Sequence, residues 1–373
     1  MVEKTFLDKA SMRGIPFVCI SLLILCSLTN QVKAQCNFSI INLPDTLSVC
    51  KNNNVSVSPS LLSTGGAPSY LDTLWTPASG LSNPNILNPN ISVGTTSTNY
   101  ILTVTGVTPN NLIANGDFSL GNTIFSSSYV YGTGGAWGLL SSEAQYAIST
   151  NPQLTHTNFA SFGDHTTGTG NMMVVNGASV ANVNIWCQSI PVTPNTDYDF
   201  SAWGATCVAS NPAILQFSIN GVLIGTPLAL PLSTGVWTPF HAVWNSGSNT
   251  SITICITDQA TAFSGNDFAI DDISFRQICY VQDSVYVKAI NLTPSIQQSI
   301  YLGCEEDSIQ FNANNGSGNI PSSYTWDLDA GFTSSVQNPF QIYPIQGNYI
   351  IKLVTELEGC KDSAFTTVNT LHP

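Results

Sequence analysis

The sequence predicts an all-β protein made of several β-sandwich domains. The chain has 373 residues, which suits two or three domains better than one. Charged residues make up only 8% of it, so Ser, Thr, Asn and Gly must supply most of the polar surface. This composition favours short strands and turns over long charged helices. No stretch beyond the N-terminus shows a sustained apolar repeat of helical period.

The charge balance argues against two classes of partner. The chain holds 9 basic and 22 acidic residues, a formal net charge of −13. Residues 1–34 hold 4 basic and 2 acidic residues, and without them the net charge is −15. A negative surface repels polyanions. We therefore expect neither nucleic acid nor an anionic membrane as a partner.

Residues 1–34 have the features of an export signal. Arg13 precedes the apolar run "IPFVCISLLILCSL", and "VKA" before Gln35 offers small residues for cleavage, so we expect cleavage after Ala34. The alternative is an uncleaved anchor, because residues 14–32 carry no charge, but the apolar core is short for a span. The sequence predicts a secreted or outer cell-surface protein with no membrane span after cleavage.

Eight cysteines remain when Cys19 and Cys26 leave with this signal. An even number in an exported protein predicts disulfides, although the sequence alone permits 105 full pairings. No CxxC motif or His-rich cluster favours zinc. The eight are Cys36, Cys50, Cys187, Cys207, Cys255, Cys279, Cys304 and Cys360.

Two segments, beginning at Cys50 and at Cys304, share a series of landmarks. In each, a cysteine is followed by a tryptophan, then a proline, then a tyrosine, and each of the three intervals is nearly the same in both segments. The two segments are therefore copies of one kind of unit. Their landmarks are Cys50, Trp75, Pro89 and Tyr100 in the first and Cys304, Trp326, Pro339 and Tyr349 in the second.

The C-terminal copy resembles a known family of sandwiches. It has a Trp-Asp strand, an Asn-Pro leading to a tyrosine, and a Gly-x-Tyr that opens an alternating strand. These residues are Trp326, Asp327, Asn338, Pro339, Tyr343, Gly347 and Tyr349. The pattern resembles the polycystic-kidney-disease (PKD) type of immunoglobulin-like β-sandwich found in surface proteins of gliding bacteria, which use type IX secretion. The sequence departs from the family at "DLDAG", where the family has a Gly-Asp-Gly turn.

The first copy is interrupted before its closing strand. In the second copy Cys360 follows soon after Tyr349 and precedes an Asp-Ser strand, whereas the equivalent Cys279 lies nearly half the chain beyond Tyr100. The excess is long enough for a whole domain and indicates one inserted at a loop tip, where chain ends lie close together. The predicted domains are residues 35–107 with 279–292 for the split immunoglobulin/PKD-like sandwich, 108–278 for the insert, and 293–373 for the PKD-like sandwich.

The equivalence of the two copies also implies a disulfide pairing. It pairs Cys304 with Cys360 and Cys50 with Cys279, each within one sandwich. The alternative for the first sandwich is the local pair of Cys36 and Cys50. The partners of the remaining cysteines stay open.

The insert opens with "NGDF" and closes with "IDDI", and alternating segments separated by turn residues lie between them. This pattern resembles a galactose-binding-type jelly roll of the carbohydrate-binding-module kind, in which these two strands lie side by side. The whole is then an immunoglobulin-like sandwich split by an inserted jelly roll and followed by a PKD-like sandwich. The expected strands lie in "NMMVVNGAS", "ANVNIWCQSIPV", "TDYDFSAWGATCV", "AILQFSINGVLIG", "VWTPFHAVWNSG" and "TSITICITD".

The resemblance implies a structural calcium ion where the first and last strands of the insert meet. Asp117 and Asp272 match the relevant positions and offer the hard oxygen ligands that calcium prefers. The alternative is that Asp117 caps a turn and one of Asp271 and Asp272 faces solvent, because adjacent strand residues point to opposite faces.

Sugar binding needs aromatic rings and polar groups on one surface. In "YDFSAWG" the alternation places Trp203 on the same face as polar residues. Trp137 lies in the glycine-rich "GTGGAWGLL" near Tyr131, and His241 points away from its apolar neighbours in "FHAVW". We expect these four residues to contact a ligand. The alternative is that the rings pack in the core or at its rim.

No enzyme signature is present. Asp164 beside His165 lacks a serine in an activated turn, since the chain has no GxSxG. The carboxylates of 305–307 and those of Asp327 and Asp329 lie in the small C-terminal sandwich, which offers no deep cleft. We therefore expect a protein that is not an enzyme.

The sequence thus predicts an exported binding or adhesion protein whose partner is a polysaccharide or glycoconjugate held by the jelly roll. The main alternative is a structural spacer or stalk whose jelly roll binds only calcium. A third is an accessory part of a larger hydrolase. Because the chain stops just after its last predicted strand, we also expect further repeats in the same polypeptide.

Overall fold

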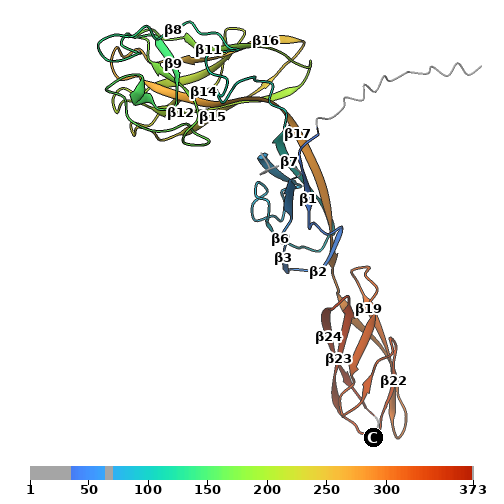
Figure 1. The fold of residues 1–373 in the computed structure, drawn as a ribbon. Coiled ribbons are helices and arrows are strands. Elements are labelled where there is room, and N and C mark those ends of the chain that lie inside the picture. Colours follow the sequence, from blue (N-terminus) through green and yellow to red (C-terminus); the bar gives the residue numbers. More distant parts are fainter. Residues whose placement is uncertain (1–34, 64–69, 372–373) are drawn as a thin grey trace, which may run out of the picture. The chain divides into compact units, whose positions relative to one another are not determined.

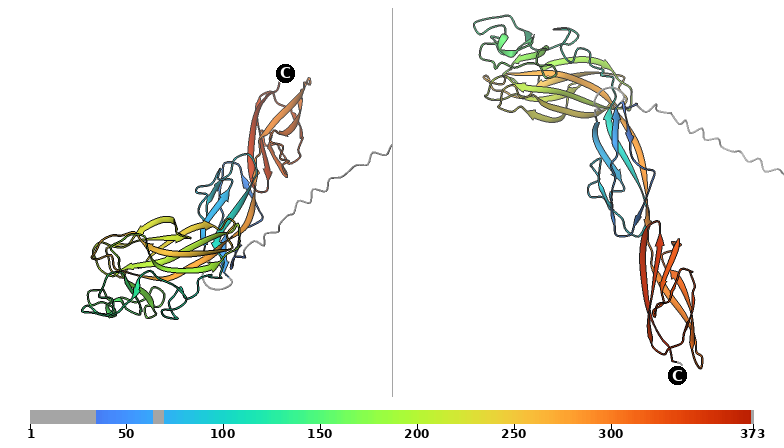
Figure 2. Two further views of the ribbon diagram at one scale, coloured as in Figure 1. Left: turned by 90° about the horizontal axis from the view of Figure 1, so that it is seen from above. Right: turned by 60° about the horizontal axis from the view of Figure 1, so that its bottom comes forward.

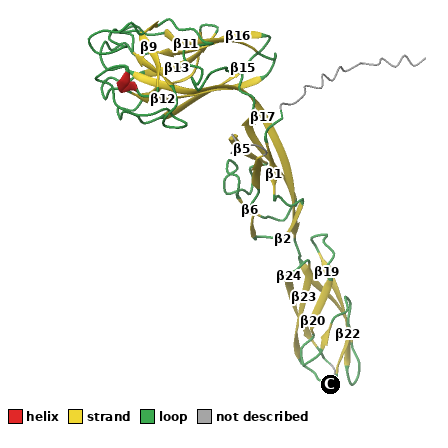
Figure 3. Cartoon of the chain, in the orientation of Figure 1, coloured by secondary structure: helices red, strands yellow, loops and turns green. Residues whose placement is uncertain are grey.

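The computed structural model describes residues 35–63 and 70–371 (Figure 1). The predicted export signal lies outside the described residues. The regular secondary structure of the described residues consists of strands and one short 3-10 helix, η1 (Pro152–Leu154), joined by loops (Figure 3). The all-β fold class is therefore confirmed. None of the helical segments within these ranges has the length and apolar character needed to cross a membrane.

The N-terminal sandwich is built from seven strands and the second half of an eighth. A sheet of β5, β7, β17 and β2 faces the pairs β1–β4 and β3–β6 across a core that contains Trp75 and Leu102, both fully buried. The indole Nε1 of Trp75 donates to the carbonyl oxygen of Ile86, 3.1 Å away. The strands are β1 (Phe38–Ile41), β2 (Thr46–Cys50), β3 (Asn54–Ser56), β4 (Ser60–Ser63), β5 (Tyr70–Thr76), β6 (Asn90–Ser92) and β7 (Thr98–Val107).

The inserted jelly roll has two sheets, with strand orders β15-β12-β17-β10-β9-β8 and β11-β16-β13-β14. Aromatic rings fill the space between them; Phe200 stacks on Phe217 with centroids 3.9 Å apart. The strands are β8 (Val130–Tyr131), β9 (Gln145–Ser149), β10 (Met172–Asn176), β11 (Val183–Pro191), β12 (Asp197–Thr206), β13 (Ile214–Ile219), β14 (Val222–Ala229), β15 (Thr238–Asn245), β16 (Ser251–Asp258) and β17 (Phe268–Ile290).

The segment "AILQFSINGVLIG", expected to hold one strand, holds parts of two. Asn220 and Gly221 both have positive φ and form a two-residue hairpin loop between β13 and β14. Asn-Gly favours such turns because Asn tolerates the left-handed region and Gly has no Cβ. The Asn220-Gly221 turn therefore ends β13 and begins β14, although the alternation in this segment predicts a single strand.

Strand β17 belongs to both the jelly roll and the N-terminal sandwich. It is 23 residues long, against an ordinary strand of about 5 or 6. It pairs with β12 as far as Gln277 and with β7 from Ile278 onward, and its last residues pair with β2 in parallel. Figure 2 shows this strand from two further sides. The insert therefore returns the chain to its host without a break in the strand.

The C-terminal sandwich repeats the tryptophan arrangement of the first. Its sheets are β18-β19-β22 and β21-β20-β23-β24. The indole Nε1 of the fully buried Trp326 donates to the carbonyl oxygen of Val336, 3.0 Å away, as Trp75 does to Ile86. The strands are β18 (Pro294–Tyr301), β19 (Asp307–Asn315), β20 (Ser323–Asp327), β21 (Thr333–Ser334), β22 (Phe340–Tyr343), β23 (Asn348–Leu357) and β24 (Cys360–Asn369).

Both predicted disulfide pairings, and the alternative Cys36–Cys50, are wrong. Cys50 lies opposite Ile290, eleven residues along β17 from Cys279, which is about 36 Å at about 3.3 Å per residue. A disulfide spans no more than about 7 Å between Cα atoms. The bonds formed are Cys36–Cys279, Cys50–Cys360 and Cys187–Cys255, with Cα atoms 5.5, 5.4 and 4.1 Å apart.

The same argument from strand length separates Cys304 from Cys360. Cys304 precedes β19, whose first residue, Asp307, accepts a hydrogen bond from the backbone of Leu371 beyond the end of β24. Cys360 begins β24, and so lies at the opposite end of that strand. Cys304 is exposed and unbonded, and the buried Cys207 is also a free thiol.

Candidate functional site

The outer face of β12 carries the polar residues that alternate with its core residues. The inward positions are the buried Tyr198, Phe200 and Ala202. The outward positions are Asp199, Ser201 and Trp203. Because successive side chains of a strand point to opposite faces, these three residues line one surface of the sheet.

The neighbouring strands extend this polar face. Ser201 lies opposite His241 of β15 on one side and opposite Ser274 of β17 on the other. Two residues back along β12, Asp199 lies opposite Arg276 of β17. Side chains from three adjacent strands, about 4.8 Å apart, therefore form a grid on the outer face.

A bulge in β17 displaces the carboxylates at the other end of the grid. Ser274 faces Ser201, but Asp271 faces Trp203, so β17 holds one more residue than β12 between these pairs. Asp272 has a φ of +49° and is partly exposed, while Asp271 is buried. Burial raises the pKa of Asp271 to about 7, and the charge of Asp272 adds to the rise.

Residues 108–117 form a wall along the edge of β17 that β12 does not cover. The backbone N–H of Leu112 donates to the carbonyl of Phe275, and that of Ile273 donates to the carbonyl of Gly116, both at 2.9 Å. A Cβ on Gly116 would collide with the carbonyl of Ile273. Only glycine therefore allows this segment to approach β17 so closely.

The expected strand at "NGDF" is a turn. The N–H of Phe118 donates to the carbonyl of Asn115 at 3.3 Å, and both residues have positive φ. The side-chain amide of Asn115 also donates to the carbonyls of Gly121 and Thr123, at 2.9 and 3.0 Å. Local side-chain hydrogen bonds of this kind compete with strand formation.

The grid and the wall enclose a hollow of about 650 Å³. Of the predicted site residues, Trp203, His241, Asp117 and Asp272 line it. Trp137 and Tyr131 do not. The other polar side chains in the lining, which the sequence did not predict as site residues, are Asn111, Asn115, Asp199, Ser201, Ser274 and Arg276.

Trp203 is held by a histidine on one face. The rings of Trp203 and His165 stack with centroids 3.8 Å apart and planes 18° apart. His165 also meets Trp237 edge to face at 5.9 Å. Since Trp203 lines the hollow and His165 does not, the part of the indole that reaches the hollow is not the face that His165 covers.

The loop that carries His165 was considered in the sequence only for catalysis, and its role as a support for Trp203 was missed. The backbone N–H of His165 donates to Asp271 Oδ2 at 3.0 Å, and its Nδ1 lies 2.6 Å from Asp272 Oδ2. These contacts join residues that are far apart along the chain. The local sequence gives no signal for them.

Asp164 fixes the shape of this loop. Its carboxylate accepts hydrogen bonds from the N–H groups of Thr167 at 2.9 Å and Gly170 at 2.6 Å, and from the Thr167 hydroxyl at 2.9 Å. Burial alone would raise the pKa of Asp164, but these hydrogen bonds outweigh it and lower the pKa. Because both carboxylate oxygens accept hydrogen bonds from within the loop, Asp164 stabilises the conformation of the loop.

The charged groups in the hollow are unevenly paired. Asp199 Oδ1 lies 3.1 Å from His241 Nδ1, and the side chain of His241 is 62% exposed. Burial raises the pKa of Asp199, and His241 offsets part of the rise. Within the described residues Arg276 forms no ion pair, and its buried Nε has no hydrogen-bond partner.

The predicted calcium ligands are engaged with protein donors. Asp117 Oδ1 accepts from the N–H and the hydroxyl of Ser119, at 3.1 and 2.9 Å, and Asp272 Oδ2 meets His165 and the hydroxyl of Thr166. Across residues 35–63 and 70–371, no three His, Cys, Asp or Glu side chains converge on a common metal position. Both carboxylates therefore accept hydrogen bonds from neighbouring groups, and their binding of calcium stays a prediction.

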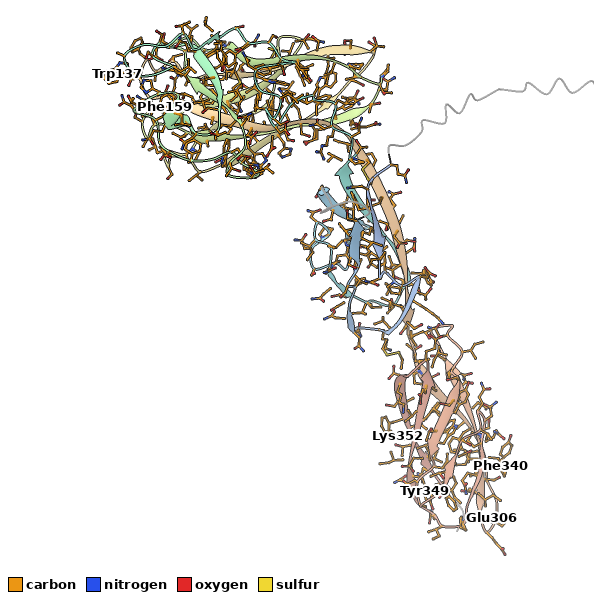
Figure 4. All side chains as sticks on the ribbon, in the orientation of Figure 1. Trp137, Phe159, Glu306, Phe340, Tyr349 and Lys352 are labelled. Carbon is orange, nitrogen blue, oxygen red and sulfur yellow. A yellow bond between two sulfur atoms is a disulfide. The ribbon has the colours of Figure 1, made fainter. Side chains whose placement is uncertain are left out.

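The two aromatic residues outside the hollow pack against other rings. Trp137 is 52% exposed and stacks on His156 with centroids 6.2 Å apart; Figure 4 shows it at the periphery of the jelly roll. Tyr131 meets Tyr146 edge to face at 5.4 Å. The structure does not bring these residues together with Trp203 in one hollow.

Comparison with known proteins gives similarity of fold at low identity. No family model matches this chain, and no curated protein matches it. A sugar-binding protein, the EclA C-terminal domain, is 18% identical, with a TM-score of 0.23, over 25% of this chain and 66% of that one. The PKD1 domain of Vibrio anguillarum Epp is 21% identical, with a TM-score of 0.19, and the match covers 22% of this chain and 96% of that domain. A CBM22-1 xylan-binding domain from Paenibacillus barcinonensis is 14% identical, with a TM-score of 0.27, over 42% and 95%.

Proposed function

We propose that this chain is an exported, non-catalytic binding protein that holds a saccharide in the hollow of its jelly roll. The observation that carries the proposal is the grid on the outer face, where Trp203 shares one hollow with Ser201, Ser274 and His241. An aromatic surface can pack against the apolar face of a sugar ring, and hydroxyl and imidazole groups can bond its hydroxyls.

The support beneath Trp203 favours binding over a merely exposed ring. The stack on His165 and the contact of His165 with Asp272 fix the indole before any ligand arrives. A preorganised aromatic residue loses little conformational entropy on binding. Trp137 rests on His156 at the longer distance of 6.2 Å and does not line the hollow.

The three disulfides support export. Bonds of this kind form and persist in oxidising compartments outside the cytosol. A secreted or outer cell-surface location is therefore part of the proposal. Export by type IX secretion is proposed on the resemblance of the sequence alone.

Saccharide binding in the hollow does not require calcium. Asp117 and Asp272 remain predicted calcium ligands. An unchanged melting temperature after addition of EDTA would remove calcium from the description.

A structural spacer is the second candidate. It is favoured by the disulfide that links Cys50 of β2 to Cys360 of β24, because a covalent bond between two sandwiches resists their separation. In that case the jelly roll has no glycan partner.

A glycan array separates the two candidates. The chain from Gln35 onward, the predicted mature form, is applied as wild type and as Trp203→Ala, His241→Ala and Trp137→Ala. We expect the first two variants to lose binding and Trp137→Ala, which changes a tryptophan outside the hollow, to keep it. Each variant's melting temperature controls for folding. Absence of wild-type binding to every polysaccharide would favour the spacer.

A further inference from the structure

Arg276 is the one arginine in the described part of the chain, since Arg13 lies in residues 1–34. It is partly buried and lines the hollow. Its Nε is shielded from solvent and finds no acceptor among the described residues. Because the side chain lines the hollow and its guanidinium forms no ion pair within the described residues, the group can take an acceptor supplied by a ligand.

Asp199, the carboxylate that lies opposite Arg276, is already engaged. It lies opposite Arg276 in the pairing of β12 and β17, but the two side chains form no ion pair. Its side chain instead lies 3.1 Å from His241 Nδ1. Burial raises the pKa of Asp199. The charge of Arg276 opposes this rise less than His241 does. The charge of Arg276 is therefore available to a ligand.

The other carboxylates of the hollow lie toward its Trp203 end. Asp272 lies in the bulge of β17 and pairs with His165. It is four residues from Arg276 along the strand, which corresponds to about 13 Å. Asp117, the last residue of the wall, accepts a hydrogen bond from the hydroxyl of Ser119. At physiological ionic strength exposed charges are largely screened beyond about 8 Å. The hollow thus has an aromatic end with Asp117 and Asp272, while at its other end Arg276 lies opposite Asp199, which pairs with His241.

A guanidinium recognises oxyanions better than it recognises neutral hydroxyls. Its planar fork donates two parallel hydrogen bonds to a carboxylate or a sulfate, and such charge-assisted bonds are roughly twice as strong as neutral ones. The side chains of Ser274 and His241, which face Ser201 from either side, supply further polar contacts between the two ends of the hollow.

We propose, on the basis of the saccharide-binding function above, that the hollow takes an acidic saccharide whose anionic group is held by Arg276 while a neighbouring ring packs against Trp203. The shared chemistry of the ligand is a sugar that carries an oxyanion. A uronic acid carboxylate and a sulfate ester are the two sources of that oxyanion.

The test measures the affinity of the chain from Gln35 onward by titration calorimetry with three matched ligands. They are a uronic-acid oligosaccharide, the same oligosaccharide with its carboxylates reduced to alcohols, and a sulfated oligosaccharide of equal length. We expect one of the two anionic ligands to bind about ten- to a hundredfold more tightly than the reduced one. The anion that binds better identifies the source.

Arg276→Gln, which keeps most of the side-chain length without the charge, is expected to remove this preference. Arg276→Lys keeps the positive charge but lacks the planar guanidinium, and we expect it to reduce the preference for the anionic ligand. It is the second test of Arg276 if Arg276→Gln does not fold. Lys361→Gln, which removes an equal charge from β24, is expected to keep it. Melting temperatures report folding in each case.

The outcomes separate this inference from the function on which it rests. Equal wild-type affinity for the anionic and the reduced ligand would overturn the acidic-saccharide inference and leave saccharide binding in place. A preference that survives in folded Arg276→Gln and Arg276→Lys would overturn the role of Arg276. Failure of wild type to bind all three ligands and every array polysaccharide would overturn both proposals.

Discussion

Ile278 of β17 lies directly opposite Val107 of β7, at the point where the inserted jelly roll leaves its host and returns to it. One residue earlier, Gln277 still pairs with Tyr198 of the jelly roll. The two ends of the insert are therefore neighbours in one antiparallel ladder. The host can accept the insert at this point without losing a strand.

Removing the insert should leave a folded N-terminal sandwich. We expect a chain that lacks residues 108–277, with Val107 joined to Ile278 by an Asn-Gly turn, to fold because the paired ends already match a hairpin. Cooperative thermal unfolding and formation of the Cys36–Cys279 disulfide are the measurements. A product that unfolds without cooperativity while the full chain does not would contradict the insertion.

The stack beneath Trp203 should matter for stability and for binding. His165→Ala removes the ring and its contact with Asp272, and we expect it to lower the free energy of unfolding by about 1 to 2 kcal/mol. It should also weaken saccharide binding, because the indole loses its support. Chemical denaturation and calorimetry measure the two effects.

His156→Ala is the matched control, because His156 stacks on Phe159 at 4.6 Å and does not adjoin the hollow. We expect it to lower stability by a similar amount and to leave binding unchanged. Equal loss of binding in both variants would contradict a specific role for the His165 stack.

Asp164 should stabilise the His165 loop in a pH-dependent way. Against the opposing effect of burial, hydrogen bonds lower its pKa in the folded state. Its contribution is therefore fully present above the ordinary Asp pKa, about 3.9, and is lost as the pH falls through the folded value. We expect Asp164→Asn to lower the free energy of unfolding by about 1 to 3 kcal/mol at pH 7. Denaturation from pH 7 down to pH 2 measures the difference, which should shrink at the acid end. A constant difference would contradict this assignment.

The cysteines should react in two classes. Cys304 is exposed and should react with a thiol reagent in the native protein. Burial raises the pKa of the Cys207 thiol well above its usual range, so this residue should react only after unfolding. Cys304→Ser should abolish the reaction of the native protein and leave the reaction of Cys207 in the unfolded protein. A native reaction at Cys207 would contradict its burial.

Peptide mapping under non-reducing conditions tests the disulfides themselves. We expect linked peptides that contain Cys36 with Cys279, Cys50 with Cys360, and Cys187 with Cys255. A linked peptide of Cys304 with Cys360 would contradict this pairing.

The predictions that succeeded rest on short-range patterns. Alternation in β12 set Trp203 beside Asp199 and away from Phe200, and the structure confirms this division between the outer face and the core. The landmark spacing made Trp75 and Trp326 equivalent, and both indoles do donate to a carbonyl ten or eleven residues on. A strand's period of two and the intervals between landmarks are visible in sequence.

The sequence by itself thus determined the all-β class, the repeat with its interruption, and the face on which Trp203 stands. The tertiary structure alone decided that Cys50 meets Cys360 across 310 positions, that His165 supports Trp203, and that Arg276 faces the same hollow. The physical reason is that strand alternation fixes only the side of a sheet. Which residues share that side depends on strand order and register, and contacts between distant strands set these.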